Sequence, residues 1–280
     1  MKRLWIILAL AAMFSGCKKD AAVQMGTINV WVNPFTLIDE ELSGSKASAS
    51  QAVTRIDAAL FDNAGTCVAS VNQDTSSGVA FGNVSFTVPN GSYTLVVIGH
   101  KSAASATITS TTAVSFANDK LSDTYSATRA ITVSGGVGQN LSMQLSRCVS
   151  MFVIRATDAV PAGVATIQTV FSAGGVTLNP TTGFAPNNTG RTSATTIPAS
   201  RVGTTNLGVN SYLLLNTDPQ NVNVTVNVLD STSATMYSRT FTNVNFRRGH
   251  RISAIGPLFS VDNAGTFTFD NTWIEDTISF

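Results

Sequence analysis

The two histidines are the first residues to test for chemistry, because imidazole is the commonest acid, base or metal ligand near neutral pH. Neither His100 nor His250 has a second ligand-type residue beside it at metal-binding spacing. His250 stands in the segment 247–251, Arg-Arg-Gly-His-Arg, which could bind an acidic glycan or a phosphate. A hairpin turn with its charges in solvent is the plainer interpretation.

Carboxylates are the second possible source of catalysis. Asp39, Glu40 and Glu41 are consecutive, but paired carboxylates do acid-base work only where a rigid scaffold fixes their separation. A solvated charge run at the edge of a Ser/Ala-rich stretch is the simpler interpretation. The sequence has no calcium-binding loop, phosphate-binding glycine loop or serine-centred elbow. We therefore expect no enzyme, no metal site and no cofactor.

Cys17 is the residue whose context predicts the clearest chemistry. Lys2 and Arg3 precede an apolar run at 4–14, and Ser15 and Gly16 separate that run from Cys17. This order is typical of an export signal, and 11 residues are too few to span a bilayer, which takes about 20. The ending resembles the bacterial lipobox, with Phe14 in place of the usual leucine. We expect a lipid on Cys17, while a soluble secreted protein is the alternative.

Cys67 and Cys148 remain after lipidation of Cys17. An exported chain matures where disulfides can form, so these two cysteines could pair. Sequence positions say nothing about the distance between their Cα atoms, and both could instead be small buried residues. Whether they are bonded is left open.

Composition excludes one class of partner. Charged residues make up 12% of the chain, and the formal net charge is +1. Loss of Lys2 and Arg3 with the signal lowers this charge to about −1, so no electrostatic attraction to nucleic acid is expected.

Short alternating strands dominate the mature chain, and no segment has convincing helical periodicity. The strands expected are 26–33, 55–61, 84–88, 93–98, 141–145, 149–156, 164–171, 211–215, 222–229, 236–246, 250–259 and 266–269. Segment 149–156 is apolar on both faces, as a central strand should be. We expect an all-β fold of two tandem β-sandwiches, 18–147 and 148–280, behind a signal at 1–17.

Three other features yield expectations about local structure. Segments 33–52 and 172–210 break the strand pattern, and both are expected to be flexible rather than folded, although the second is so long that it should hide one or two short strands. Asp-Asn-Ala-Gly-Thr occurs at 62–66 and 262–266, either as a trace of domain duplication or as a turn that arose twice. Trp31 and Trp273 lie in strand-like context, so core packing is expected for both.

Several motifs together resemble the fimbrillin-type lipoproteins of Bacteroidota, the subunits and anchors of type V pili. They are the lipobox at Cys17, the Pro-Asn-Gly-Ser-Tyr turn at 89–93, which is expected to close a hairpin between 84–88 and 93–98, the junction 145–151, and the closing hairpin at 246–259. The resemblance implies two transthyretin-like sandwiches that assemble by strand exchange. It further implies that a protease cuts after an arginine behind the first strand, and Arg55 is the position that fits. Anchor subunits of the family keep their lipid and are not cut.

The leading functional hypothesis is a structural surface lipoprotein, either a pilus subunit or a pilus anchor or minor component. Its partners would be other pilus subunits, the outer-membrane lipid through Cys17, and a host or bacterial surface ligand. We expect it lipid-anchored in the outer membrane, at the cell surface or in a fimbrium. The alternative is a glycan-binding surface lipoprotein of a polysaccharide-uptake system, which would need clustered solvent-facing aromatics; the candidates are Trp31, Trp273, Tyr125 and Tyr212.

Overall fold

Alternation of apolar and polar residues gives this chain its strands. The structure, a computed structural model, describes residues 23–32, 53–76, 80–260 and 268–270. In β1 (Met25–Val32) and β15 (Gln220–Leu229) every second side chain is buried. Helical residues in the described ranges are confined to the short 3-10 turns η1 (Ala117–Asp119) and η2 (Ala199–Arg201). The expected all-β fold of two sandwiches is confirmed.

The N-terminal sandwich is built from strands β1 to β10. Its smaller sheet has the order β4-β1-β9, and its larger sheet has the order β10-β8-β5-β2-β3. A two-stranded ribbon of β6 and β7 lies beside them. The strands other than β1 are β2 (Arg55–Asp62), β3 (Cys67–Asp74), β4 (Asn83–Pro89), β5 (Gly91–His100), β6 (Thr107–Ser110), β7 (Ala113–Ser115), β8 (Thr124–Val133), β9 (Gln139–Met143) and β10 (Ser146–Arg147).

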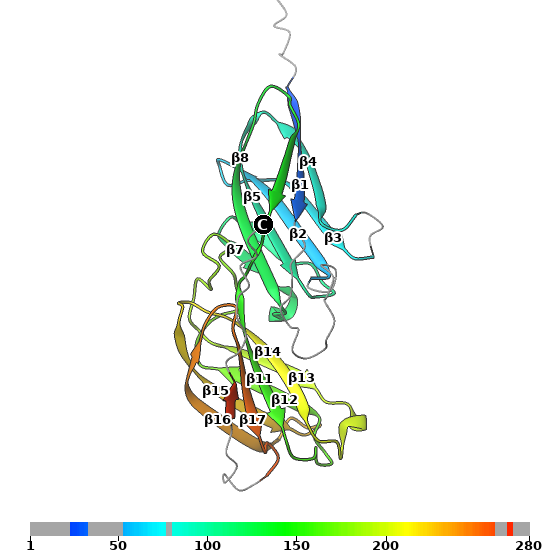
Figure 1. Cartoon of the computed structure of the whole chain (residues 1–280), viewed down its shortest axis with the longest axis vertical. Helices are drawn as coiled ribbons and strands as arrows, with labels where there is room; N and C mark the ends of the chain where they lie inside the picture. The colour runs from blue at the N-terminus through cyan, green and yellow to red at the C-terminus, as the bar shows by residue number, and fades with distance from the viewer. Residues whose placement is uncertain (1–22, 33–52, 77–79, 261–267, 271–280) are drawn as a thin grey trace, which may run out of the picture.

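The C-terminal sandwich is built from β11 to β18. Its sheets have the orders β14-β11-β17-β18 and β13-β12-β15-β16. The strands other than β15 are β11 (Val149–Ala156), β12 (Thr166–Phe171), β13 (Arg191–Thr196), β14 (Leu207–Leu214), β16 (Thr235–Phe246), β17 (Arg251–Gly256) and β18 (Thr268–Asp270). Figure 1 shows the two sandwiches end to end along the long axis. We retain Arg147/Cys148, between β10 and β11, as the proposed domain boundary.

The two sandwiches repeat one topology. The order β4-β1-β9 corresponds to β14-β11-β17, and the order β3-β2-β5-β8 corresponds to β13-β12-β15-β16. In each smaller sheet the first strand of the sandwich is antiparallel to one neighbour and parallel to the other. The repeated pentapeptide does not mark this repetition, because 62–66 joins β2 to β3 whereas 262–266 lies between β17 and β18 in the sequence.

Each sandwich has its own apolar core, and a third cluster joins the two. Phe152, Phe171, Phe241 and Phe246 centre the C-terminal core with ring centroids 5.8–6.4 Å apart. The joining cluster combines side chains of β2 and β5, such as Phe61, with Cys148 and with residues of the C-terminal sandwich. Val114 and Leu178 exchange backbone hydrogen bonds of 2.8 and 2.9 Å across it. The outer side of β2 and β5, in the larger N-terminal sheet, is thus buried by the junction.

Segment 172–210 is more ordered than its composition suggests. It contains β13, η2 and the first residues of β14, which confirms the expectation of hidden strands. Leu178 and Ala185 from the same segment are 0% and 3% exposed in the joining cluster. A segment rich in Gly, Thr and Asn therefore forms part of the contact between the sandwiches. Segment 33–52 lies outside the described residues.

Two turns expected to close hairpins instead connect different sheets. β4 and β5 flank Asn90, but β4 pairs with β1 and β5 pairs with β2 and β8. The Tyr93 hydroxyl donates to the Pro89 carbonyl at 2.8 Å and fixes this corner. The segment 247–250 likewise joins β16 to β17, which belong to separate sheets. A turn motif predicts a chain reversal but does not determine which strand pairs with which.

Candidate assembly strand and its open face

β1 occupies the middle of the smaller N-terminal sheet. It is antiparallel to β4, with Val30 opposite Val84, and parallel to β9, with Val30 beside Leu141. Strand exchange, which the resemblance implies, requires the first strand, predicted at 26–33, to be removable; in the structure both backbone edges of β1 are paired. Removing β1 would leave a slot between two strands rather than a bare edge.

The inward face of β1 belongs to the sandwich core. Ile28, Val30 and Val32 are 0%, 2% and 4% exposed and pack with the side chains of both N-terminal sheets. Burial of each contributes about 1.5–3 kcal/mol relative to exposure. The slot is therefore defined by apolar contacts on one side and by two ladders of backbone hydrogen bonds along its edges.

The outward face of β1 carries Trp31, for which the strand context predicts core packing. Its side chain is 50% exposed, so that prediction was wrong. The physical reason is register, because Val30 and Val32 occupy the inward positions on either side of it. Trp31 stands over a groove of about 670 Å³ formed by all three strands of the smaller sheet. The lining residues are Asn29, Val30, Trp31, Asn83, Val84, Ser85, Asn140, Leu141 and Ser142.

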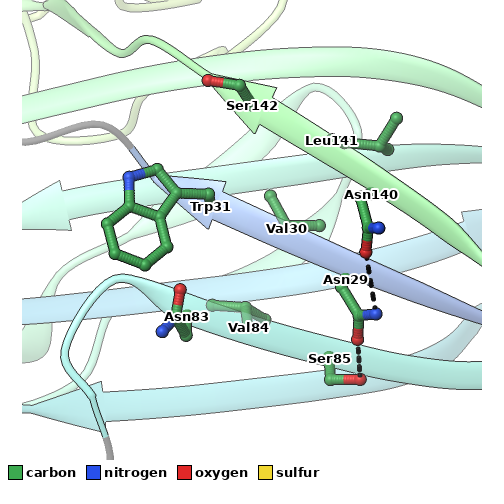
Figure 2. A pocket seen from close by; sticks show the side chains of 9 residues that line it. All are labelled: Asn29, Val30, Trp31, Asn83, Val84, Ser85, Asn140, Leu141 and Ser142. Atoms are coloured by element: carbon green, nitrogen blue, oxygen red, sulfur yellow. Dashed lines mark hydrogen bonds between the residues drawn. The ribbon is translucent and has the colours of Figure 1, made fainter.

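Polar side chains cross this groove as a ladder perpendicular to the strands. The Ser85 hydroxyl donates to Asn29 Oδ1 at 2.9 Å, and Asn29 Nδ2 donates to Asn140 Oδ1 at 3.0 Å. Figure 2 shows these two bonds in line, with the Trp31 ring farther along β1. No lining residue is charged. The face therefore presents neutral donors and acceptors next to one aromatic ring.

Arg55, the expected cleavage position, begins β2 and is held on three sides. Its guanidinium donates to the Ala103 carbonyl at 2.9 Å and to the Ser105 hydroxyl at 3.0 Å, and it forms a 3.3 Å ion pair with Asp74. β2 pairs with both β3 and β5, and Ile56 on the other side of the scissile bond is 2% exposed. A protease would have to separate these strands to reach the bond. Cleavage at Arg55 stays a prediction.

His100 meets a carboxylate, but in the interior of the protein. Its Nε2 lies 2.7 Å from Asp57 Oδ2, and both side chains are 1% exposed. The same oxygen accepts the backbone N–H of Ala106 at 2.6 Å. An enzyme would need such a pair in an exposed cleft. The geometry instead fits a structural pair that fixes the residue before the β6–β7 ribbon against β2 and β5.

The basic segment around His250 is a turn, with its charges only partly in solvent. Arg247 is exposed, whereas Arg248 and His250 are half-buried. The Arg248 guanidinium lies 4.9 Å from the centre of the Phe184 ring and donates to the Thr182 carbonyl at 3.3 Å. These contacts attach the turn to segment 172–190. Within the described ranges, no group of three or more His, Cys, Asp or Glu side chains could hold a metal ion.

The two remaining cysteines are free and lie in different surroundings. Cys67 is exposed on β3, whereas Cys148 is buried between the sandwiches. Cys148 Sγ lies 3.0 Å from the Ser126 hydroxyl. Burial, partly offset by this bond, raises the pKa of the Cys148 thiol to about 11. The disulfide that the sequence left open is not formed in this structure. Cys17 lies outside the described residues.

The candidate sugar-binding aromatics do not form one cluster. Tyr125 is buried under the Arg147 guanidinium, 4.9 Å from its ring centre, and Tyr212 is half-buried. Arg147 also donates two bonds, of 2.8 and 3.0 Å, to Asp123. Burial raises the pKa of the Tyr125 hydroxyl above its ordinary value. Trp31 is therefore exposed without Tyr125 or Tyr212 beside it in the groove, and Trp273 lies outside the described residues.

Comparisons with known proteins concern family and fold. The model of a family of unknown function, DUF6562, matches residues 65–279. No curated protein matches the sequence. A candidate adhesin from Bacteroides ovatus has a similar structure, with a TM-score of 0.50, 15% identity and 79% of each chain covered. This likeness confirms the fold that the fimbrillin-type resemblance implied.

The comparison of structures also finds the fimbrial anchor protein Mfa2 from Porphyromonas gingivalis. It has a TM-score of 0.43 and 12% identity, and 89% of this chain and 98% of that chain are covered. A fimbrial assembly protein from Parabacteroides distasonis has a TM-score of 0.42 and 11% identity, with 89% of this chain and 96% of that chain covered.

In the part of this chain that the structure describes, no helix has the length and hydropathy to cross a bilayer.

Proposed function

Since this chain belongs to DUF6562, a family of unknown function, we propose its role from its structure: it is a non-enzymatic surface component of a fimbrial or adhesive assembly. A lipid on Cys17 would hold it in the outer membrane, with its sandwiches at the cell surface or at the base of a fimbrium. Its partners would be other subunits, joined by strand exchange, and a ligand on a host or bacterial surface would be its target.

The position of β1 is the observation that carries this proposal. β1 is the first described strand, it is paired on both edges, and it supplies three buried side chains to the core. A slot left by such a strand offers two rows of unpaired backbone groups and an apolar floor. An incoming strand with the same alternation would refill both, which is the physical basis of assembly by strand addition.

Between a polymerising subunit and a tethered component, we favour the tethered component. The bond after Arg55 lies within a strand that is paired on both sides, and the Arg55 side chain is engaged by Asp74, Ala103 and Ser105. Proteases bind their substrates as extended, accessible segments. The uncut chain would keep both β1 and the lipid, and would act as a membrane anchor for other subunits.

An arginine-specific protease tests this choice. We expect folded, lipidated chain to survive digestion at Arg55 and to remain monomeric on cells, because β2 is held in the sheet. The Arg55→Lys variant, which the protease cannot cut there, is the matched control. A ladder of polymers from the natural chain that disappears in Arg55→Lys would contradict the tethered role and establish the polymerising one.

A complementation experiment tests the slot independently of any protease. A chain that starts at Val53 lacks β1, and a peptide of the sequence Met25–Val32 should bind it and restore its resistance to unfolding. The same peptide with Val30→Asp places a charge at a buried position and should not bind. If the two peptides bind equally well, or if neither binds, β1 does not occupy an exchangeable slot.

A further inference from the structure

The open face of the smaller N-terminal sheet has the features of a ligand site. Trp31, Asn29, Asn83, Ser85, Asn140 and Ser142 all stand on it, and they come from three strands that are far apart in sequence. Most large apolar side chains in the described part of the protein are buried, whereas Trp31 is 50% exposed. A large exposed aromatic beside a groove with several convergent polar side chains points to a binding role.

Backbone groups are not what this face offers to a ligand. The N–H and C=O groups of β1 are bonded to β4 and β9, so an incoming peptide strand has no edge to join on this face. What remains is side-chain chemistry, namely one ring and several amides and hydroxyls. Each amide carries two donors and two acceptor lone pairs, and the ladder bonds described above use only part of that capacity.

This combination matches the surface of a neutral sugar. A pyranose has an apolar face of C–H groups with slight positive charge, which packs on the negative face of an aromatic ring. Its hydroxyls lie around the edge of that face, and each can both donate and accept a hydrogen bond. The amide and hydroxyl side chains of the groove have the same dual capacity, and no carboxylate or cation is among the lining residues.

The spacing within the groove fits a short saccharide. Trp31 lies opposite Asn83 and beside Ser142, whereas Asn29 lies opposite Ser85 and beside Asn140. These two rows are about 6.5 Å apart along β1, and the three strands together are about 10 Å wide. One sugar unit stacked on Trp31 would have its neighbour over the Asn29 row.

We propose that this groove binds a neutral oligosaccharide, with the Trp31 ring as the stacking platform and the row of Ser85, Asn29 and Asn140 as the hydroxyl-recognising group. The site goes beyond the proposed role in assembly, and it exists only while β1 remains in place. A polymerising subunit that lost β1 would lose the site, whereas a tethered component would keep it.

Fluorescence of Trp31 provides the test. The protein used is the full chain without its signal. Cys17→Ser prevents lipidation, and Trp273→Phe leaves Trp31 as the single tryptophan. This protein is titrated with cello-, manno- and xylo-oligosaccharides. At least one series should shift the emission, with a dissociation constant on the order of 0.1–1 mM, because a single stacking platform binds weakly. Calorimetry with Trp273 restored confirms the constant.

Variants assign the binding to the groove. Trp31→Ala should weaken affinity about tenfold or more, and Asn29→Ala about threefold to tenfold. Trp31→Phe, which keeps a smaller ring, should retain part of the affinity. Val68→Ala, at an exposed apolar residue on the other sheet, is the matched control and should change nothing. Thermal unfolding of each variant verifies its fold.

Three results would overturn the proposal. The first is the absence of binding by any neutral oligosaccharide up to about 10 mM. The second is binding that Trp31→Ala leaves unchanged. The third is preference for oligogalacturonate that depends on Arg129, the exposed cation that donates to the Ser142 carbonyl at 3.0 Å beside the groove. The protease experiment does not affect this test, because the uncut chain is used throughout.

Discussion

The first strands of the two sandwiches, β1 and β11, occupy the same place in one repeated topology but differ on one face. Both are central, antiparallel to one neighbour and parallel to the other. On β1 the outward residues include Asn29 and Trp31, and both are exposed. On β11 the outward residues include Met151 and Val153, which are 5% exposed and contact Tyr212.

This difference is why we propose strand exchange for β1 and not for β11, although the two strands share one topology. β11 is packed on both faces, so its removal would expose apolar surface on each side. β1 is packed on one face only and has solvent on the other, so its removal costs less of the hydrophobic free energy. The same open face gives β1 room for the groove, and β11 has no equivalent. Strand exchange and ligand binding are therefore both proposed for the N-terminal sandwich.

The largest expected effect comes from placing a carboxylate on the outward face of each strand. Val153→Asp should destabilise the C-terminal sandwich by about 4 kcal/mol or more, because a charge would be buried without a partner. Asn29→Asp, the matched change on β1, should alter stability by no more than about 0.5 kcal/mol. Urea unfolding monitored by circular dichroism measures both. Similar losses would mean that the outward face of β1 is covered in solution.

Truncation of one aromatic residue in each strand should give the next largest difference. Phe152→Ala removes the ring at the centre of the four-phenylalanine cluster and should cost about 3–5 kcal/mol. Trp31→Ala removes a larger side chain that is half in solvent and should cost about 1 kcal/mol or less. The same unfolding experiment tests this pair. A cost above about 3 kcal/mol for Trp31→Ala would refute the open face.

The contrast between β1 and β11 could be predicted from their residues. Ile28, Val30 and Val32 alternate with more exposed residues, whereas 149–156 is apolar on both faces, and the structure confirms both patterns. The place of Trp31 could have been predicted from the same register, since it stands between two inward valines. Strand context alone does not predict core packing, because an alternating strand has one face outside the core.

Strand pairing could not be predicted in the same way. Local residues predict the turn at Asn90 and the turn at 247–250, yet each turn connects two sheets, because pairing depends on residues distant in sequence. No strand is predicted at β8 (Thr124–Val133), because its composition is largely polar and small. β8 is stable because it pairs with β5 over ten residues. Long-range contacts, which no local pattern encodes, create this strand.

The junction between the sandwiches gives the third prediction, through Cys148. Its buried thiol has a pKa of about 11, against 9.0 for an ordinary cysteine, so the folded state holds the proton more tightly than the unfolded state. Below pH 9 both states are protonated and the contribution to stability is complete. As pH rises from about 9 to about 11, only the unfolded state loses the proton, and about 2–3 kcal/mol should be lost.

The Cys148→Ala variant should lack this additional loss of stability. The free energy of unfolding is measured against pH for both proteins, and the difference between them is the contribution of the thiol. In a Cys17→Ser background, a maleimide should label only Cys67 in the native protein and both thiols after unfolding. Rapid native labelling of Cys148 would mean that the two sandwiches separate readily. The junction would then not be the rigid contact that buries the outer side of β2 and β5.

The smallest expected effect concerns a turn that both sandwiches share. In the turn after β2, Asp62 Oδ1 accepts the N–H groups of Ala64 and Thr66; in the turn after β15, Asp230 Oδ1 accepts those of Thr232 and Ala234. Gly65 has a φ of +79°, and the matching Ser233 has a φ of +68°. A side chain in this left-handed region is strained, by about 1–2 kcal/mol.

Exchange of these two residues should therefore have opposite effects. Ser233→Gly should stabilise the C-terminal sandwich by up to about 1 kcal/mol, since relief of strain exceeds the added entropy of the unfolded chain. Gly65→Ser should destabilise the N-terminal sandwich by about the same amount. Differential scanning calorimetry follows the two transitions. The two turns have the same hydrogen bonds, so they should impose the same backbone conformation on either residue. If both unfolding temperatures move in the same direction, the two turns are not equivalent.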